Sequence, residues 1–251
     1  QLPESCSDGL IALLYKKKER EDPRNYRPIT LLNADYKIMM RVLANRLGIA
    51  AVQFVSDTQT GFVPDAFIGE NIMLLKLIQA HIEDVFERNE RALDASDNDS
   101  SSDETESSDE TGTDPEPDEG YFVFLDMEKA FDRCSWEFLI KALREVGFNE
   151  RFIRFITLAY SHEHAPQRRL YVNGYLGPAF SLGSGVAQGC PISPLLFLII
   201  AEPLSRLITN DPDFKGILIN HIRHKLSQYA DDSTLICSPG DEVPAALNLR
   251  K

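Results

Sequence analysis

The stretch KLSQYADDSTLIC, residues 225–237, decides the fold of this chain. Two segments of strand length, KLSQY and STLIC, flank the tripeptide Ala230-Asp231-Asp232. Two strands are therefore expected to meet at a tight turn that carries two adjacent carboxylates. Since Asp favours turns, a solvated turn without function is the alternative for this pair taken alone.

A second carboxylate position lies about a hundred residues earlier. The run YFVFLD, Tyr121 to Asp126, is continuous, apolar and of strand length, which predicts a buried central strand that ends on Asp126. If this strand lies beside the hairpin, three carboxylates come together. Two Mg²⁺ ions bridged by carboxylates are the usual means of neutralising charge in nucleotidyl transfer, and Mg²⁺ prefers such hard oxygen ligands.

The surrounding patterns predict alternating helices and strands, and hence an α+β or α/β sheet protein. Ser135 is expected to cap a helix that Gly147 ends. Its apolar stripe is Trp136, Leu139, Ile140, Leu143 and Val146. Helical spacing also predicts helices over residues 36–47 (Ile38, Met39, Val42, Leu43, Leu47) and 71–86 (Ile72, Leu75, Ile78, Ile82, Phe86). Residues 168–172 with Asn173-Gly174 predict a strand and turn, and Ser193-Pro194 an N-cap and helix start.

Charge divides the chain. Residues 94–119 hold twelve acids and no Lys or Arg, and without them the formal charge of -13 would be close to neutral. This composition predicts a disordered insertion between residues 1–93 and 120–251. The first fifty residues are basic, with nine Lys and Arg against six acids. Phosphate binding requires such cations.

Other classes of protein are disfavoured. The four cysteines form no C-x-x-C pair, which argues against zinc and disulfides and fits an intracellular compartment. The longest apolar run, residues 195–201, is too short to span a membrane. The chain begins at Gln1 and ends soon after the hairpin, so we expect it to be a piece of a longer protein.

Three ordered motifs carry a family resemblance. FLDMEKAFD (124–132), GVAQGCPISPLLF (185–197) and YADD (229–232) resemble the A, B and C motifs of reverse transcriptases. Residues 25–47 and 58–72 are similar to the fingers segments of the LINE-type enzymes of non-LTR retrotransposons. The resemblance implies a right-hand polymerase: fingers in 1–93, the insertion in 94–119, and a palm in 120–251 with a small antiparallel sheet packed on helices. It also implies that the thumb is missing.

The resemblance assigns roles to individual residues. Asp126 and Asp231 would be shared magnesium ligands, with Asp232 beside them and the carbonyl of Met127 as a further ligand. Phe131 would exclude a 2′-hydroxyl from the incoming nucleotide, with an ordinary core aromatic as the alternative. The remaining nucleotide-binding candidates are Gln188, Gly189, Arg27, Lys37 and Arg46.

The implied activity is RNA-directed DNA synthesis. It would use two Mg²⁺ ions, which Mn²⁺ can replace, together with an RNA template, a DNA primer and dNTPs. An endonuclease and a thumb elsewhere in the full-length protein, and a nuclear location, are also implied. An RNA-directed RNA polymerase, an inactive retroelement remnant, and a maturase or telomerase-like protein are the alternatives.

Overall fold

The computed structural model describes residues 6–97, 120–163 and 165–241 of the chain. The part of the insertion from 98 to 119 lies outside the described residues. The helices are α1 (Ala34–Phe54), α2 (Ile68–Asp97), α3 (Trp136–Val146), α4 (Glu150–Ala159) and α5 (Ser193–Asn210), with a short 3-10 turn at Pro23–Asn25. The strands are β1 (Gly9–Tyr15), β2 (Tyr26–Leu32), β3 (Tyr121–Asp126), β4 (Gln167–Val172), β5 (Tyr175–Ser181), β6 (Ile217–Ile219), β7 (Ile222–His224), β8 (Leu226–Tyr229) and β9 (Asp232–Cys237).

A three-stranded antiparallel sheet contains both predicted carboxylate segments. Its order is β3-β9-β8, so the strand of Asp126 pairs directly with the second strand of the hairpin. The predicted strand and hairpin are confirmed, but the expectation of a buried central strand at Tyr121 to Asp126 is wrong. In this sheet β3 is an edge strand and Phe124 is 73% exposed, whereas β9 is central and buried from Ser233 to Cys237. A run of apolar residues does not by itself show how many neighbours a strand has.

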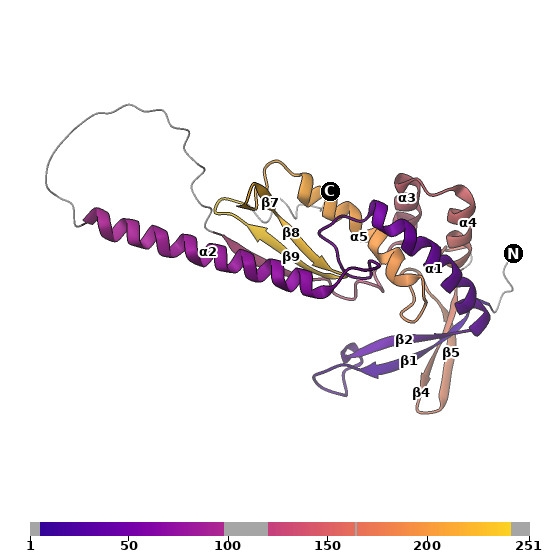
Figure 1. The fold of residues 1–251 in the computed structure, drawn as a ribbon. Coiled ribbons are helices and arrows are strands. Elements are labelled where there is room, and N and C mark those ends of the chain that lie inside the picture. The colour runs from indigo at the N-terminus through magenta and orange to yellow at the C-terminus, as the bar shows by residue number, and fades with distance from the viewer. Residues whose placement is uncertain (1–5, 98–119, 164, 242–251) are drawn as a thin grey trace.

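Helices cover both faces of this sheet. On one face Phe122 and Ile236 pack with Ile78 of α2, which runs along the sheet in Figure 1. On the other face Leu235 packs with Ile208 of α5. The sheet therefore lies between two helices that come from opposite sides of the predicted insertion.

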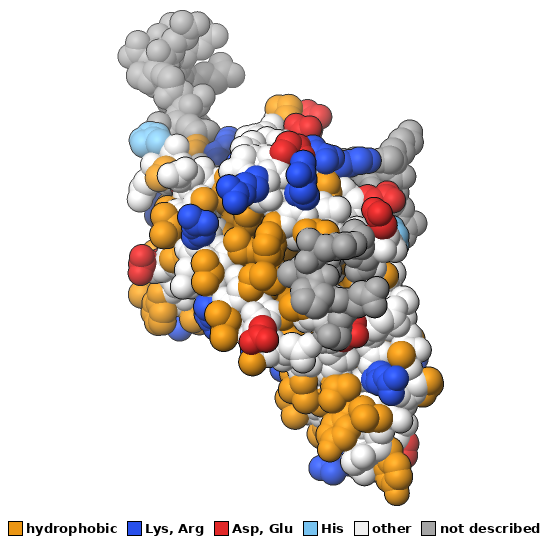
Figure 2. Space-filling model, turned by 90° about the vertical axis from the view of Figure 1, so that its right-hand side faces the viewer, with side chains coloured by type: hydrophobic (Ala, Val, Ile, Leu, Met, Phe, Trp, Pro, Cys, Tyr) orange, Lys and Arg blue, Asp and Glu red, His pale blue; other side chains and the backbone are white. Residues whose placement is uncertain are grey.

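A second sheet joins the beginning of the chain to its middle. Its order is β2-β1-β4-β5, with β1 parallel to β4. The predicted turn at Asn173-Gly174 connects β4 and β5, and both turn residues have positive φ (51° and 85°). This sheet projects from the body at the bottom of Figure 1, and Figure 2 shows hydrophobic side chains on the corresponding lower projection. The four-stranded sheet therefore joins strands that come before the predicted insertion to strands that come after it.

The main core lies among α1, α3, α4 and α5. The predicted α3 caps are confirmed: Ser135 accepts a hydrogen bond from the N–H of Phe138, and Gly147 ends the helix with φ 94°. The predicted start of α5 is wrong in one respect, because the N-cap is Ile192. The hydroxyl of Ser193 instead lies 3.3 Å from that of Tyr160 in the core.

The apolar stripes expected for the first two helices are partly wrong. Both helices extend beyond their predicted ends, and α2 continues through residues 94–97 of the expected insertion. In α1 the buried face is centred on Met40 and Leu47, while Ile38 is 65% exposed and Val42 54%. Four-residue spacing places Ile38 and Val42 on one face, but that face does not meet α5. Among the described residues, no helix is both long and apolar enough to cross a membrane.

Candidate active site

Three Asp residues lie at one end of the three-stranded sheet. Asp126 ends β3, Asp232 begins β9, and the two are direct partners in the antiparallel register. Directly opposed residues have Cβ atoms about 4.5–5.5 Å apart and point to the same face. Asp231 precedes Asp232 in the two-residue turn that follows Tyr229. The fold therefore joins two segments that are a hundred residues apart in the sequence.

The donor set has the chemistry of a divalent-cation site. Asp126 and Asp232 are exposed and Asp231 is half-buried. None of the ion pairs within the described ranges involves Asp126, Asp231 or Asp232. In the same part of the chain, no three His, Cys, Asp or Glu side chains are already grouped to hold a metal ion. As direct partners in the register, Asp126 and Asp232 could share a divalent metal ion. Met127 follows β3 directly, and its side chain packs against the main core.

Phe131 lies in a stack of aromatic rings after β3. It is half-buried, with its ring parallel to that of Phe197 in α5 at 4.9 Å between centroids and 10° between planes. The ring of Phe62 meets it edge-on at 6.1 Å. The ring is thus held in one orientation, as either a gate or a core aromatic would be.

Gln188 and Gly189 connect β2 of the four-stranded sheet to the segment that follows β3. The N–H of Thr30 in β2 donates to the carbonyl of Gln188 at 2.7 Å, and the Gln188 amide donates to Asp132 at 3.3 Å. Gly189 has φ 114°, and a Cβ there would lie 2.6 Å from the Thr30 carbonyl, so only glycine fits. This loop holds β2 close to the segment that follows Asp126.

Asp132 is a carboxylate beside the site that sequence reasoning did not single out. Burial raises its pKa above the ordinary value, although the hydrogen bond from Gln188 and the charge of Lys129 oppose the shift. Its place in FLDMEKAFD, six residues after Asp126, was the available signal.

The three predicted basic candidates are not brought into this cluster. Arg27 is exposed on β2, in the other sheet, and Lys37 and Arg46 are exposed on α1. A groove of about 1010 Å³ runs between α1, the segment after it and the start of α5, and its lining includes Tyr229. Among the described residues, the α1 cation that lines this groove is Arg41, not Lys37 or Arg46. The sequence does not show which face of α1 lines the groove, so it does not distinguish Arg41 from Lys37 and Arg46.

The segment between α1 and α2 was also missed as part of the site. Gln59 is buried, and its side chain hydrogen-bonds to the backbone of Ala230 in the acidic turn. In the sequence it belongs to residues 58–72, which resemble a fingers segment. A buried amide that binds a distant turn leaves no periodic signal in the sequence.

Comparison with solved structures identifies the fold. The chain resembles apo telomerase from Candida tropicalis, truncated from its C-terminal domain, with a TM-score of 0.56 at 12% identity. The likeness covers 99% of this chain and 46% of that one. At this identity the comparison shows a shared mixed α/β fold, one that telomerase also uses.

Comparison of sequences then identifies the family. Residues 15–250 match the model of the reverse transcriptase (RNA-dependent DNA polymerase) family, and the chain belongs to that family. It is 28% identical over 94% of its length to the uncharacterized 149 kDa protein of transposon TX1 from Xenopus laevis. It is 24% identical over 99% of its length to a retrovirus-related Pol polyprotein from the type-1 retrotransposable element R2 of Nasonia vitripennis. The chain spans only 15% and 20% of those two relatives.

Proposed function

We propose that this chain is the part of a non-LTR retrotransposon reverse transcriptase that carries the polymerase active site. The observation that carries the proposal is the register of β3 and β9, which sets Asp126 opposite Asp232 with Asp231 beside them. The family match and the transposon relatives give these carboxylates their chemical context. The reaction would add dNTPs to the 3′-hydroxyl of a DNA primer along an RNA template.

Asp126, Asp231 and Asp232 would hold divalent metal, with the Met127 carbonyl as a further ligand. Bound Mg²⁺ supplies charge neutralisation at the attacking and leaving oxygens, and Mn²⁺ can take its place. Two of the three carboxylates are exposed, so a metal ion from solution would reach them directly. Phe131 would close the space under the sugar of the nucleotide, and Gln188 and Gly189 would line the same pocket. Arg27, Lys37 and Arg46 would supply cations for phosphate, and a guanidinium suits that task.

The right-hand arrangement follows as part of the proposal. The three-stranded sheet with α2 and α5 would form the palm. The four-stranded sheet with the loop at Gln188 would form the fingers, so β4 and β5 would join residues 1–93 in that role. The acidic segment 94–119 would be an insertion between fingers and palm. The thumb and an endonuclease would belong to the rest of a longer protein acting in the nucleus.

Primer extension on an RNA template with Mg²⁺ tests the proposal. The intact chain is compared with the Asp231→Ala/Asp232→Ala double variant, each with dNTPs and with rNTPs. We expect extension with dNTPs only, and its loss in the double variant. Replacement of Asp213, an exposed acid outside the cluster, by Ala gives the matched control and should leave extension intact.

The other outcomes favour other functions. Extension with rNTPs at similar rates would favour an RNA-directed RNA polymerase and remove the role given to Phe131. If no primer extension is observed, even when the segment that follows in a longer protein is added, an inactive retroelement remnant would be favoured. Activity that survives in the double variant would show that the acidic turn is not the active site.

A further inference from the structure

Gln59 binds the backbone of the acidic turn from the segment that joins α1 to α2. Its Oε1 accepts hydrogen bonds from the N–H groups of Ala230 and Gly61, both at 2.8 Å. Its Nε2 donates to the carbonyl oxygen of Ala230 at 3.1 Å. One side chain therefore satisfies both backbone polar groups of the residue that immediately precedes Asp231.

Ala230 needs such support. It has φ 58°, a left-handed backbone conformation that residues other than glycine adopt at a cost in free energy. It is also 4% exposed, as is Gln59, so water does not replace a lost partner easily. A strained conformation persists only where its surroundings hold it. Since the two residues are 171 positions apart, only the fold provides this contact.

Close backbone approach reinforces the contact. A Cβ at Gly61 would lie 2.0 Å from the nitrogen of Ala230, so the segment passes directly against the turn. Thr58 and Thr60 bond to the backbone of Gln228 on β8, at 2.7 and 3.0 Å. The turn is thus lined by a short stretch of chain rather than by one isolated side chain.

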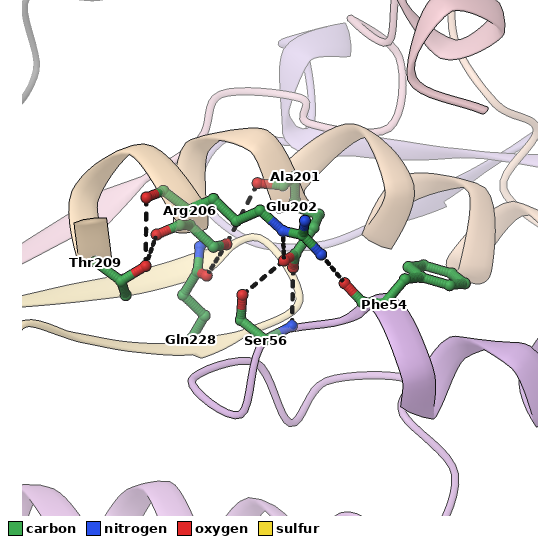
Figure 3. Close-up of polar contacts among 8 residues, drawn as sticks. Phe54, Ser56, Ala201, Glu202, Arg206, Thr209 and Gln228 are labelled. Carbon is green, nitrogen blue, oxygen red and sulfur yellow. Dashed lines mark hydrogen bonds and ion pairs between the residues drawn. The ribbon is translucent and has the colours of Figure 1, made fainter. Parts of the chain in front are cut away.

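The same stretch is anchored to α5 at its start. Glu202, which is buried, accepts hydrogen bonds from the N–H of Ser56 at 3.0 Å and from its hydroxyl at 2.6 Å. Arg206 binds Glu202 and also donates to the carbonyl of Phe54 at 2.8 Å. Figure 3 shows Glu202 and Arg206 reaching from α5 to this segment. The segment that carries Gln59 is therefore held to α5 close to the point where Gln59 contacts the turn.

We propose that Gln59 is a positioning residue for nucleotidyl transfer. By holding both backbone groups of Ala230 it fixes the turn, so that Asp231 and Asp232 lie next to Asp126. This inference rests on the proposed function, because it assigns Gln59 to the same carboxylates.

Two matched substitutions test the inference. Gln59→Met keeps the length of the side chain and removes all three hydrogen bonds. Gln228→Met is the control: Gln228 is 1% exposed, and its amide bonds to the side chains of Ser205 and Ser233 rather than to the turn backbone. Both variants lose a buried amide from the same region, so thermal unfolding should show losses of stability of similar size.

Amide hydrogen exchange by NMR gives a readout that does not depend on activity. We expect the Ala230 N–H to exchange at least about tenfold faster in Gln59→Met and at the wild-type rate in Gln228→Met. In primer extension, kcat of Gln59→Met should fall by on the order of tenfold to a hundredfold, as for a small misplacement of reacting groups. The KM for primer–template should stay unchanged, and the Mg²⁺ concentration for half-maximal rate should rise.

Equal losses of kcat in the two variants would overturn the proposal, as would unchanged exchange at Ala230 in Gln59→Met. If the wild-type chain does not extend primers, the fault lies with the proposed function. The exchange experiment then still decides whether Gln59 holds the turn.

Discussion

Replacement of Phe131 by Ala separates the two roles that this aromatic residue can have. The ring stacks on Phe197 at 4.9 Å and meets Phe62 edge-on at 6.1 Å. Each such pair contributes about 0.5–1.5 kcal/mol beyond buried area, and truncation of a fully buried Phe to Ala costs about 3–5 kcal/mol. Since Phe131 is only half-buried, we expect Phe131→Ala to lower the free energy of unfolding by about 2–3 kcal/mol.

A gate predicts a second effect that a core aromatic does not. Removing the ring opens space for a 2′-hydroxyl, and steric discrimination in an apolar pocket is worth about 10- to 200-fold. The ratio of kcat/KM for dTTP to that for UTP should therefore fall by on the order of a hundredfold, or about 2.7 kcal/mol.

Phe197→Leu is the control for this assay, because it removes the stacking partner and leaves the ring of Phe131 in place. It should cost stability without changing the nucleotide ratio. Loss of stability in Phe131→Ala with an unaltered nucleotide ratio would refute the gate and leave Phe131 as a core residue.

Three further substitutions test individual contacts of the fold. Glu202→Gln weakens the charge-assisted bonds to Ser56 and Arg206 and should cost about 1–3 kcal/mol in urea denaturation; a change below about 0.5 kcal/mol would show that the charge is not needed. Gly189→Ala should cost about 1–3 kcal/mol from positive φ and contact with Thr30, whereas Gly183→Ala, where no atom lies within 4 Å of the new Cβ, should be nearly neutral. Burial pushes the pKa of Asp241 upward, but N–H groups of Lys215, Ser238 and Gly216 outweigh burial and hold the pKa below its ordinary value. Because folding lowers the pKa of Asp241, its carboxylate stabilises the folded protein at pH values above the unfolded-state pKa. Asp241→Asn should therefore have a smaller free energy of unfolding than the wild type at neutral pH, and the difference should disappear below roughly pH 4. A difference that does not depend on pH would contradict this assignment.

Local sequence patterns predicted the elements that depend on neighbouring residues. The cap at Ser135, the end at Gly147 and the turn at Asn173-Gly174 all follow from backbone chemistry within a few residues. The strand Tyr121–Asp126 and the hairpin at Asp231-Asp232 were predicted for the same reason. The order of the motifs also identified the family that the sequence comparison confirms.

Burial was predicted less well, because it depends on what lies opposite. The apolar run at Tyr121 to Asp126 became an edge strand, and Ile38 and Val42 are exposed although they are spaced as a helix stripe. The sequence holds the period of a helix but not the direction from which α5 approaches it. Likewise, Arg41 rather than Lys37 or Arg46 lines the groove beside Tyr229.

The sequence by itself determined which chemical groups the chain carries and in which local elements they stand. Only the tertiary structure decided that Asp126 pairs with Asp232, that Gln188 bridges β2 to Asp132, and that Gln59 holds Ala230. Each of these contacts joins residues far apart in the chain. Their energy comes from pairing buried polar groups and packing apolar surface across that separation, and no local pattern of residues records it.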